Sequence, residues 1–337
     1  MSDTYVQLTD LTLTYGQSVA VPELNLGIRE GELIALLGPS GCGKTTTMRA
    51  IAGLLAPASG RITIDGRDVT RVPANKRGIG LVFQSYALFP HLNAFENVAF
   101  GLRLQKLSAN EITERTLQGL ATVGLTGYDK RKPAEMSGGQ QQRLALARSL
   151  VMQPKVLLLD EPLSNLDARL RLEMRTELQR VQKETGVTMV FVTHDQAEAL
   201  ALADRIVLMK EGRIEQLGTP ADLYARPETA FAAEFMGFEN IFRVEGGKVV
   251  SDKGTLPLGF ATTSPLLAWR PDGVTVGSGP HEGRVVATSF AGAHREYVLE
   301  SALGPIKADA DIALPRVEIG ETLTFDLPEA TARPLAA

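Results

Sequence analysis

The sequence predicts an α/β domain built on a largely parallel sheet, with a helical subdomain inserted into it and a small all-β domain after it. The apolar blocks ELIALLG, KVLLLD and TMVFVTHD are short and continuous rather than alternating, which is typical of strands buried on both faces. Small or polar residues and then a helix-like stretch follow each block, so we expect the working loops at the carboxyl ends of these strands.

The predicted first domain covers residues 1–235, and a small OB-like β-barrel is expected at residues 240–334, where short β-like runs are divided by glycine and proline. Ser108 and Glu111 have capping-box spacing ahead of an amphipathic stretch. We therefore expect a helical subdomain at about residues 87–152. The segment RIVLMKEGRIEQLG predicts a hairpin that turns at Glu211 and Gly212.

Composition narrows the class of protein. The chain has 337 residues and a net charge of −4, which argues against a surface built to bind nucleic acid. Cys42 is the only cysteine, so no intrachain disulfide is expected and a reducing compartment is the natural interpretation. The first residues lack a secretory signal pattern, and no apolar run is long enough to cross a bilayer. Any membrane role is expected to come through a partner.

The stretch GPSGCGKT fits the phosphate-binding pattern G-x-x-x-x-G-K-[ST] and lies between a predicted strand and a predicted helix. Its glycines let backbone N–H groups turn toward phosphate oxygens, and the helix presents its positive end. Lys44 would reach the β- and γ-phosphates and the Thr45 hydroxyl would bind Mg²⁺. A plain glycine turn that caps a helix would not explain this register of Lys44 and Thr45. The predicted nucleotide-binding residues of this loop are Gly38, Ser40, Gly41, Cys42, Gly43, Lys44, Thr45 and Thr46.

Two adjacent carboxylates, Asp160 and Glu161, follow the strand-like block VLLLD. Asp160 could hold Mg²⁺ while Glu161 polarises an attacking water as a general base. The alternative is that these carboxylates are simply the acidic start of a helix after a strand, which is common in α/β folds. Taken alone, the segment would fit this alternative equally well, but the presence of the glycine loop favours the catalytic interpretation.

Two further side chains are candidates for the same edge of the sheet, and a third is a candidate for contact with the nucleotide base. Gln84 and His194 each follow an apolar block, so the Gln84 amide could ligate Mg²⁺ and orient water while the His194 imidazole donates to the γ-phosphate. The alternative for both is an ordinary polar loop residue. Tyr15 could stack on adenine, although an isolated aromatic residue is more often part of a core.

A second glycine turn occurs in MSGGQQQRLALARSL, far along the chain from the first. A helix that opens at SGGQQQR points free N–H groups at its front and forms a second anion site. The alternative is a glycine-rich cap on an amphipathic helix, with Leu144, Ala147, Leu150 and Val151 toward the core.

Together the motifs GPSGCGKTTT, VFQSYALFPHLNAFENVAFGL, MSGGQQQRLALARSL, VLLLDEPLSNLD and FVTHDQAEAL resemble the ATP-binding subunit of ATP-binding cassette (ABC) transporters over about the first 235 residues. The resemblance implies Tyr15 as the adenine-stacking aromatic, Gln84 as the hinge that senses the membrane partner, and His194 as the γ-phosphate switch. It also implies that a second copy closes over ATP and Mg²⁺ held by Lys44 and Thr45. The residues that would contribute to this closure are Ser137, Gly138, Gly139, Gln140 and Asp167.

The tail, including WRPDGV, looks like the small regulatory β-barrel of importers for sugars, polyamines and ferric iron. The implied function is ATP-driven solute uptake by a homodimer at the cytoplasmic face of the inner membrane, through integral membrane permease subunits and, indirectly, an external solute-binding protein. A cassette ATPase of DNA repair or translation is the alternative, but such proteins tend to carry long coiled-coil insertions or two cassettes, and this sequence shows neither.

Two positions depart from the family pattern. Cys42 stands where serine is frequent, and its position near Lys44 at a helix start predicts a lowered thiol pKa and sensitivity to alkylation when nucleotide is absent. Asn165, in SNLD, stands where alanine is more common, so the contact geometry around Asp167 is expected to differ from that of relatives.

Overall fold

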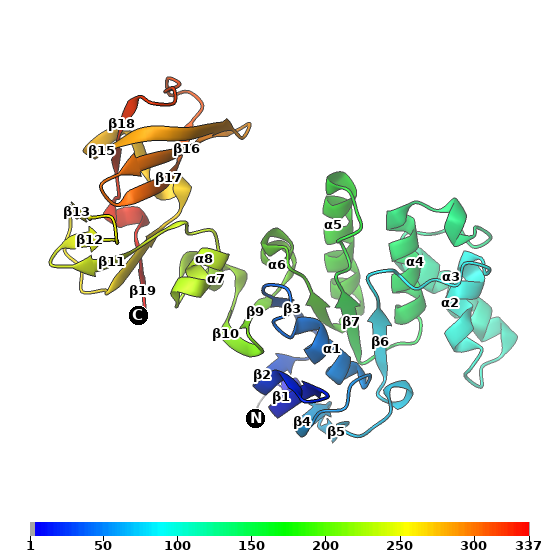
Figure 1. Ribbon diagram of the computed structural model, residues 1–337. Coiled ribbons are helices and arrows are strands. Elements are labelled where there is room, and N and C mark those ends of the chain that lie inside the picture. The colour runs from blue at the N-terminus through cyan, green and yellow to red at the C-terminus, as the bar shows by residue number, and fades with distance from the viewer. Residues whose placement is uncertain (1–3, 337) are drawn as a thin grey trace. The chain divides into compact units, whose positions relative to one another are not determined.

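A computed structural model describes residues 4–336 of the chain and divides it into two compact units, one ending at Pro220 and one beginning at Ala221 (Figure 1). Each unit has its own core. Between residues 4 and 336, no helix is both long enough and apolar enough to cross a membrane.

A six-stranded sheet forms the centre of the first unit. Its strands are β3 (Leu33–Leu37), β6 (Ile79–Val82), β7 (Val156–Asp160), β8 (Thr188–Val192), β9 (Arg205–Lys210) and β10 (Arg213–Gly218). Their order is β10-β9-β3-β8-β7-β6, with parallel pairing throughout except between β9 and β10. The three apolar blocks of the sequence are β3, β7 and β8, and their nearly complete burial confirms the predicted parallel core.

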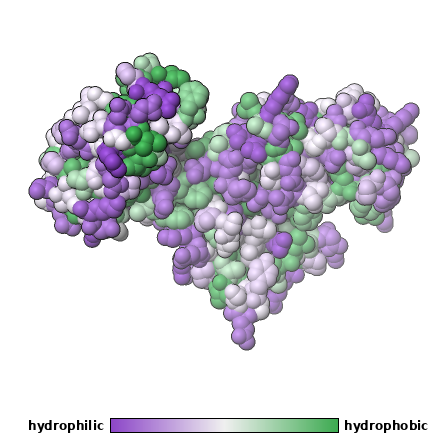
Figure 2. Space-filling model, turned by 45° about the horizontal axis from the view of Figure 1, so that its top comes forward, coloured by the Kyte–Doolittle hydropathy of each residue, from purple (hydrophilic) through white to green (hydrophobic). Residues whose placement is uncertain are grey.

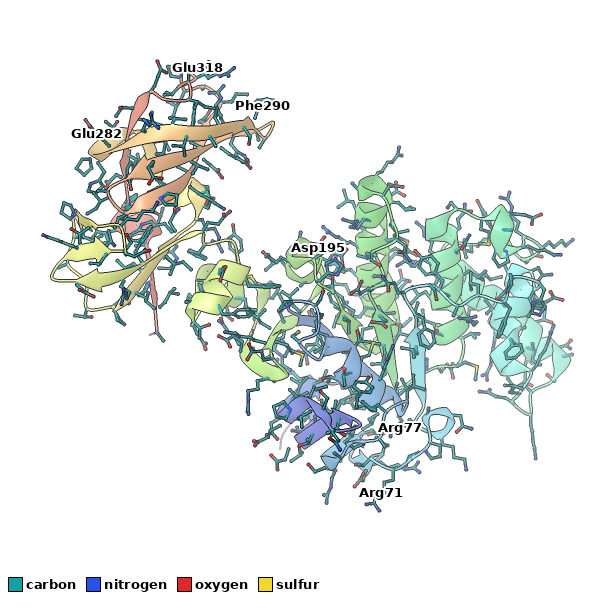
Figure 3. All side chains as sticks on the ribbon, in the orientation of Figure 1. Arg71, Arg77, Asp195, Glu282, Phe290 and Glu318 are labelled. Carbon is teal, nitrogen blue, oxygen red and sulfur yellow. The ribbon has the colours of Figure 1, made fainter. Side chains whose placement is uncertain are left out.

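A second, antiparallel sheet packs near the first. It has the order β2-β1-β4-β5, with strands β1 (Thr4–Tyr15), β2 (Ser18–Arg29), β4 (Ser59–Ile64) and β5 (Arg67–Asp68). Helix α1 (Lys44–Ala52) shares one apolar core with both sheets, through residues such as Met48 and Ile51. Arg77, labelled in Figure 3, donates to the carbonyls of Ala50 and Ile51 at 2.8 and 2.9 Å and so caps the far end of α1.

The inserted helical subdomain consists of α2 (Ala94–Leu102), α3 (Ala109–Thr122) and α4 (Gly138–Leu150). All three helices begin with a capping box, including the predicted pair Ser108 and Glu111. The chain then returns to the sheet and adds α5 (Ala168–Thr185) and α6 (Gln196–Leu202). Short 3₁₀ helices lie at Ala74–Lys76 and Pro133–Glu135.

The predicted hairpin is β9 and β10, and it turns at the predicted residues. Glu211 and Gly212 have φ values of 48° and 78°, as a two-residue turn between antiparallel strands requires. Gly212 has no room for a side chain, because an added Cβ would lie 2.4 Å from the Ala20 carbonyl oxygen.

The second unit is all-β apart from short helices, as predicted. One sheet has the order β13-β12-β11-β14-β19 and the other β17-β16-β15-β18. The strands are β11 (Asn240–Glu245), β12 (Lys248–Val250), β13 (Thr255–Pro257), β14 (Leu266–Trp269), β15 (Thr275–Phe290), β16 (His294–Ser301), β17 (Gly304–Asp311), β18 (Thr322–Asp326) and β19 (Arg333–Leu335). Trp269 and Phe325 are fully buried in the core that both sheets share.

The surface of the second unit carries several exposed apolar side chains, and Figure 2 shows green areas on this part of the chain. Among the described residues of this unit, the large ones are Tyr224, Val286, Phe290, Ile312, Leu314 and Ile319. Phe290, labelled in Figure 3, is at the end of β15.

The division between the units differs from the boundary that the sequence suggested. A first domain ending at residue 235 would include α7 (Pro220–Ala225) and α8 (Ala230–Phe235), whereas the structure groups residues from Ala221 onward with the β unit. The reason is Arg270, whose guanidinium lies 3.6 Å from the Tyr224 ring centre and 4.0 Å from that of Phe238. Arg270 also donates to the Met236 carbonyl at 3.1 Å.

Candidate functional site

The glycine loop joins the end of β3 to the start of α1, and its glycines are required by both backbone conformation and space. Gly38, Gly41 and Gly43 have φ values of 148°, 81° and 102°. A Cβ on Gly38 would lie 2.3 Å from the Met209 carbonyl oxygen, and one on Gly43 would lie 2.8 Å from Val21. The loop is therefore pressed against β9 and β2, which fixes its path around the start of α1.

Lys44 is the first residue of α1 and is buried, with 6% of its surface exposed. Its ammonium donates to the carbonyls of Gly38 and Pro39 at 2.8 and 2.9 Å. The charge is thus held at the mouth of the loop, close to the N-terminal end of the helix, where an anion is favoured. Ser40 and Gly41 at the loop tip are exposed, and Thr45 and Thr46 are partly exposed.

Cys42 corrects a sequence-based expectation. The predicted lowering of its thiol pKa is wrong: burial raises the pKa of Cys42, and this effect outweighs the opposing influence of Lys44. The side chain is only 3% exposed, beneath the loop. The Cys42 backbone carbonyl accepts from the Gly212 N–H at 3.1 Å, which ties the loop to the β9–β10 turn.

Thr45 and Asp160 come together at the end of β7, with the Thr45 hydroxyl 3.3 Å from a carboxylate oxygen of Asp160. Burial raises the pKa of Asp160, and the neighbouring Glu161 charge acts in the same direction while the Thr45 hydrogen bond opposes them. A hydroxyl and a carboxylate side by side are oxygen donors of the kind that Mg²⁺ prefers, so these two residues fit the predicted metal.

Gln84, Glu161 and His194 meet, although they come from three different strand ends. The Gln84 amide donates to Glu161 Oε2 at 3.2 Å, and His194 Nδ1 lies 3.3 Å from Glu161 Oε1. Glu161 has a φ of 44°, an uncommon conformation for a non-glycine residue, and its N–H donates to the Val192 carbonyl at 3.0 Å. The sequence predicted this convergence from the common sheet edge. The Gln84 nitrogen faces the carboxylate, so its amide oxygen is the atom left to ligate a metal.

The second glycine turn caps α4. The Ser137 N–H donates to Gln140 Oε1 at 3.0 Å, and the Ser137 hydroxyl accepts from the Gln140 N–H at 3.4 Å. Ser137 and Gly138 are exposed, whereas Gly139 is buried, and a Cβ on Gly139 would lie 2.7 Å from Leu170. Figure 1 shows α4 beside α2 and α3 in the helical subdomain, whereas α1 lies against the sheets. One chain therefore carries two separate glycine turns, each at the start of a helix.

Comparison with known proteins decides the family. Residues 21–164 match the ABC transporter family. The Fe(3+) ions import ATP-binding protein FbpC of Agrobacterium fabrum is 50% identical over 306 residues, 87% of each chain. This chain is an ABC transporter ATP-binding protein. The spermidine/putrescine import ATP-binding protein PotA of Mesoplasma florum is also similar, with 45% identity over 313 residues and 89% of each chain covered.

Solved structures of ABC cassettes resemble this ABC protein in fold. CbiO1 from Clostridium perfringens, part of the ABC transporter complex cbiONQ, is 35% identical with a TM-score of 0.63, over 66% of this chain and 92% of that chain. A dimeric post-hydrolysis state of the cassette MJ0796 bound to ADP and Pi is 35% identical with a TM-score of 0.57, over 64% of this chain and 98% of that one. These findings and the family match identify an ATP-binding and ATP-hydrolysing subunit.

Two residues of the ABC site were missed or undervalued by sequence reasoning. The Ser164 hydroxyl accepts from Gln84 Nε2 at 3.1 Å and donates to the Glu161 carbonyl at 3.0 Å. The Asn165 amide donates to the Gln84 backbone carbonyl at 2.8 Å. Asn165 was noted only as a departure from relatives, and Ser164 gave no signal of its own. Asp167 caps α5 by accepting from the Leu170 N–H at 2.9 Å.

Arg148 of α4 lies within the second glycine motif, but sequence reasoning gave it no role. Its guanidinium donates to the Tyr86 and Ala87 carbonyls and lies 5.4 Å from the Phe89 ring centre. These residues follow Gln84 in the chain, so the helix that begins with the second glycine turn also holds the loop that carries Gln84.

Tyr15 ends β1 with 47% of its surface exposed, which excludes the alternative of a core aromatic. It pairs with Ser18 at the turn into β2, the strand whose Val21 contacts the glycine loop at Gly43. An exposed ring at this end of the sheet is free to stack on a base.

Proposed function

We propose that this ABC ATPase powers uptake of a small solute through a separate integral membrane permease, by ATP-driven closure of a homodimer and hydrolysis-driven opening. The observation that carries the proposal is the meeting of Gln84 and His194 on the Glu161 carboxylate, next to Asp160 and the Thr45 hydroxyl. This arrangement suits phosphoryl transfer to water.

Each residue has a separate role in the proposed reaction. The glycine loop and Lys44 would hold the phosphates and neutralise their charge. Glu161 would accept the proton of the attacking water, while Gln84 and His194 fix the direction of its carboxylate. Thr45 and Asp160, with the Gln84 amide oxygen, would hold Mg²⁺, which when bound supplies positive charge at the phosphate oxygens.

The second glycine turn supports a shared site. Because α4 and α1 stand apart within one chain, Ser137 and Gly138 would meet a nucleotide on the glycine loop of Gly38–Thr45 only when a second copy docks. The relative MJ0796 has been solved as a dimer. Gly139 and Gln140 would support the turn from behind, by packing on Leu170 and by completing the capping box. Asp167 would support the same turn indirectly, by capping α5 and so holding Leu170 in place.

A two-variant experiment tests this function. Glu161→Gln protein should bind ATP and form a stable dimer, as measured by light scattering after size-exclusion chromatography, because closure occurs without hydrolysis. Adding Ser137→Arg should leave it monomeric while ATP binding persists. Asn110→Arg, on the exposed start of α3, is the matched control and should leave the dimer intact. Full-strength dimerisation of the Ser137→Arg protein would refute the shared site.

Ferric iron is the first candidate solute, because relatives from Agrobacterium, Rhizobium and Brucella that are 48–50% identical are named Fe(3+) importers. A polyamine is the second, because PotA is 45% identical. The protein would work at the cytoplasmic face of the inner membrane, with its permease and an external solute-binding protein. Reconstitution with the co-purifying permease and binding protein, followed by uptake of ⁵⁵Fe³⁺ against labelled spermidine, separates the two.

We also propose that the second unit regulates the ATPase. Its separate core and its exposed apolar side chains support a module that binds another partner or copy. A chain that ends at Pro220 should hydrolyse ATP without the regulation seen in the full-length transporter. If the truncated protein supports the same transport and the same regulation of ATP hydrolysis as the full-length protein, the proposal is refuted.

A further inference from the structure

The four residues Ser164–Asp167, which we call the SNLD segment, connect Glu161 to α5 and contact the Gln84 loop twice. Ser164 accepts a hydrogen bond from the Gln84 side chain at 3.1 Å. Asn165 donates to the Gln84 backbone carbonyl at 2.8 Å. Gln84 is therefore held at its side chain and its backbone by two consecutive residues of one short segment.

Burial of the Asn165 side chain does not account for its hydrogen bond to Gln84. The residue is exposed, and its neighbours Leu166 and Leu163 supply the apolar contacts of the segment. An asparagine amide provides a donor here that an alanine could not. The bond joins positions 81 residues apart in the chain, so it does not stabilise a local turn.

The segment also reaches the loop of His194 on its other side. The Leu166 carbonyl accepts from Arg171 at 3.1 Å, and Arg171 lies 3.6 Å from Glu198. Glu198 is buried and accepts from the Thr193 hydroxyl at 2.6 Å. Thr193 directly precedes His194, so both partners of the Glu161 carboxylate are tied to the SNLD segment. Asp195, labelled in Figure 3, lies 3.7 Å from the same Arg171.

We propose that Asn165 is a positioning residue of the ATPase. By fixing the Gln84 backbone, Asn165 keeps the Gln84 amide in contact with Glu161. The direction of the Glu161 carboxylate then depends on the position of the SNLD segment. A movement of the segment would break or strengthen this bond and thereby change the rate of hydrolysis. The inference rests on the proposed role of Glu161 as base.

Steady-state ATPase kinetics of the full chain test the proposal. Asn165→Ala should lower kcat by about 3- to 10-fold, the effect expected of one hydrogen bond, and leave the KM for ATP within about 2-fold. Asn165→Asp, which has the same shape but no donor, should lose at least as much. Asn110→Ala, an exposed asparagine on α3, is the control and should match the unmodified protein.

A double-mutant cycle with Gln84→Ala distinguishes positioning from a general structural role. If Asn165 acts through Gln84, Asn165→Ala should have no further effect on kcat in the Gln84→Ala protein. An equal fold-loss in both backgrounds, or an unchanged kcat in the single variant, would overturn the inference. The proposed role of Glu161 as general base is tested separately: normal ATP turnover by the Glu161→Gln protein would refute it, whatever the Asn165 variants show.

Discussion

The guanidinium of Arg148 donates at 3.0 Å to the backbone carbonyl of Tyr86, a residue held at a φ of 60°. It donates at 2.7 Å to the carbonyl of Ala87, whose φ is 47°. Two consecutive left-handed non-glycine residues are strained, so the surrounding contacts must hold them in place. Burial lowers the pKa of Arg148. A side chain of α4 thus supports the loop that carries Gln84.

Replacement of Arg148 by methionine should destabilise the first unit. The variant keeps the apolar stem but removes both donors, which leaves two carbonyls without these bonds in a strained loop. We expect a loss of about 1–3 kcal/mol in the free energy of unfolding, measured by urea titration. Arg169→Met is the control, because the Arg169 side chain on α5 is 91% exposed. Equal free energies of unfolding for the two variants would contradict the conclusion that Arg148 stabilises the loop at Tyr86 and Ala87.

Glu161→Gln should remove hydrolysis but spare nucleotide binding. The amide keeps the size of the side chain but cannot accept the proton of the attacking water, so turnover should fall by about 100-fold or more. Phosphate release measures the rate and a fluorescent ATP analogue measures binding. Glu173→Gln on the exposed surface of α5 serves as control. Near-normal phosphate release from the Glu161 variant would require a different base.

Gly138 and Gly139 should respond differently to alanine, although both belong to the second glycine turn. A Cβ on Gly139 would lie 2.7 Å from Leu170 Cδ1, whereas one on Gly138 would meet Leu166 Cδ2 at an ordinary 3.5 Å. Gly139→Ala should therefore cost about 1–3 kcal/mol of unfolding free energy, and Gly138→Ala much less. Adding Leu170→Ala to Gly139→Ala should recover part of the loss by making space. Identical thermal unfolding of the two single variants would be evidence against this packing.

Asp160→Asn should raise the melting temperature while abolishing hydrolysis. Because burial raises the pKa of Asp160, the folded state binds the proton more tightly than the unfolded chain. The protonated Asp160 carboxyl therefore stabilises the folded state at low pH, and this stabilisation is lost as the pH rises through the folded-state pKa. At pH 8 a neutral amide should therefore be better tolerated than the carboxylate, and the advantage should shrink in acid. Differential scanning calorimetry in EDTA measures this, and a lower melting temperature at pH 8 would reverse the conclusion.

Cys42 should react slowly with iodoacetamide in the native protein. Its thiol is buried and burial raises its pKa, so the reactive thiolate is scarce and poorly accessible. Mass spectrometry should show complete labelling in urea and little labelling at pH 8 without it. Labelling at the same rate in both conditions would restore the expectation of a reactive thiol.

Local patterns in the sequence were sufficient for much of the fold and site. The continuous apolar blocks predict β3, β7 and β8, and the residues at the ends of such strands predict that Gln84, Glu161 and His194 come together. The Glu211–Gly212 turn and the Ser108 cap follow from residue chemistry over a few positions.

Contacts between distant segments could not be predicted in the same way. The Asn165 bond to Gln84 and the Arg148 bond to Tyr86 each depend on how separate elements pack. Cys42 was misjudged because Lys44 is visible in the sequence, whereas the burial of the thiol beneath Gly38 is a product of folding. Arg270 similarly assigns α7 and α8 to the second unit through stacking on Tyr224 and Phe238.

The hydrogen bond from the Gly212 N–H to the Cys42 carbonyl has a consequence for the order of folding during synthesis. A growing chain makes Gly38–Thr45 early, but β9, one of the two strands that flank β3, and the turn that rests on this loop come only after residue 204. The phosphate loop therefore cannot reach its final form until nearly the whole first unit has left the ribosome. A nascent chain stalled before Arg205 should be unable to retain ATP, even though it already contains every residue of the Glu161 cluster.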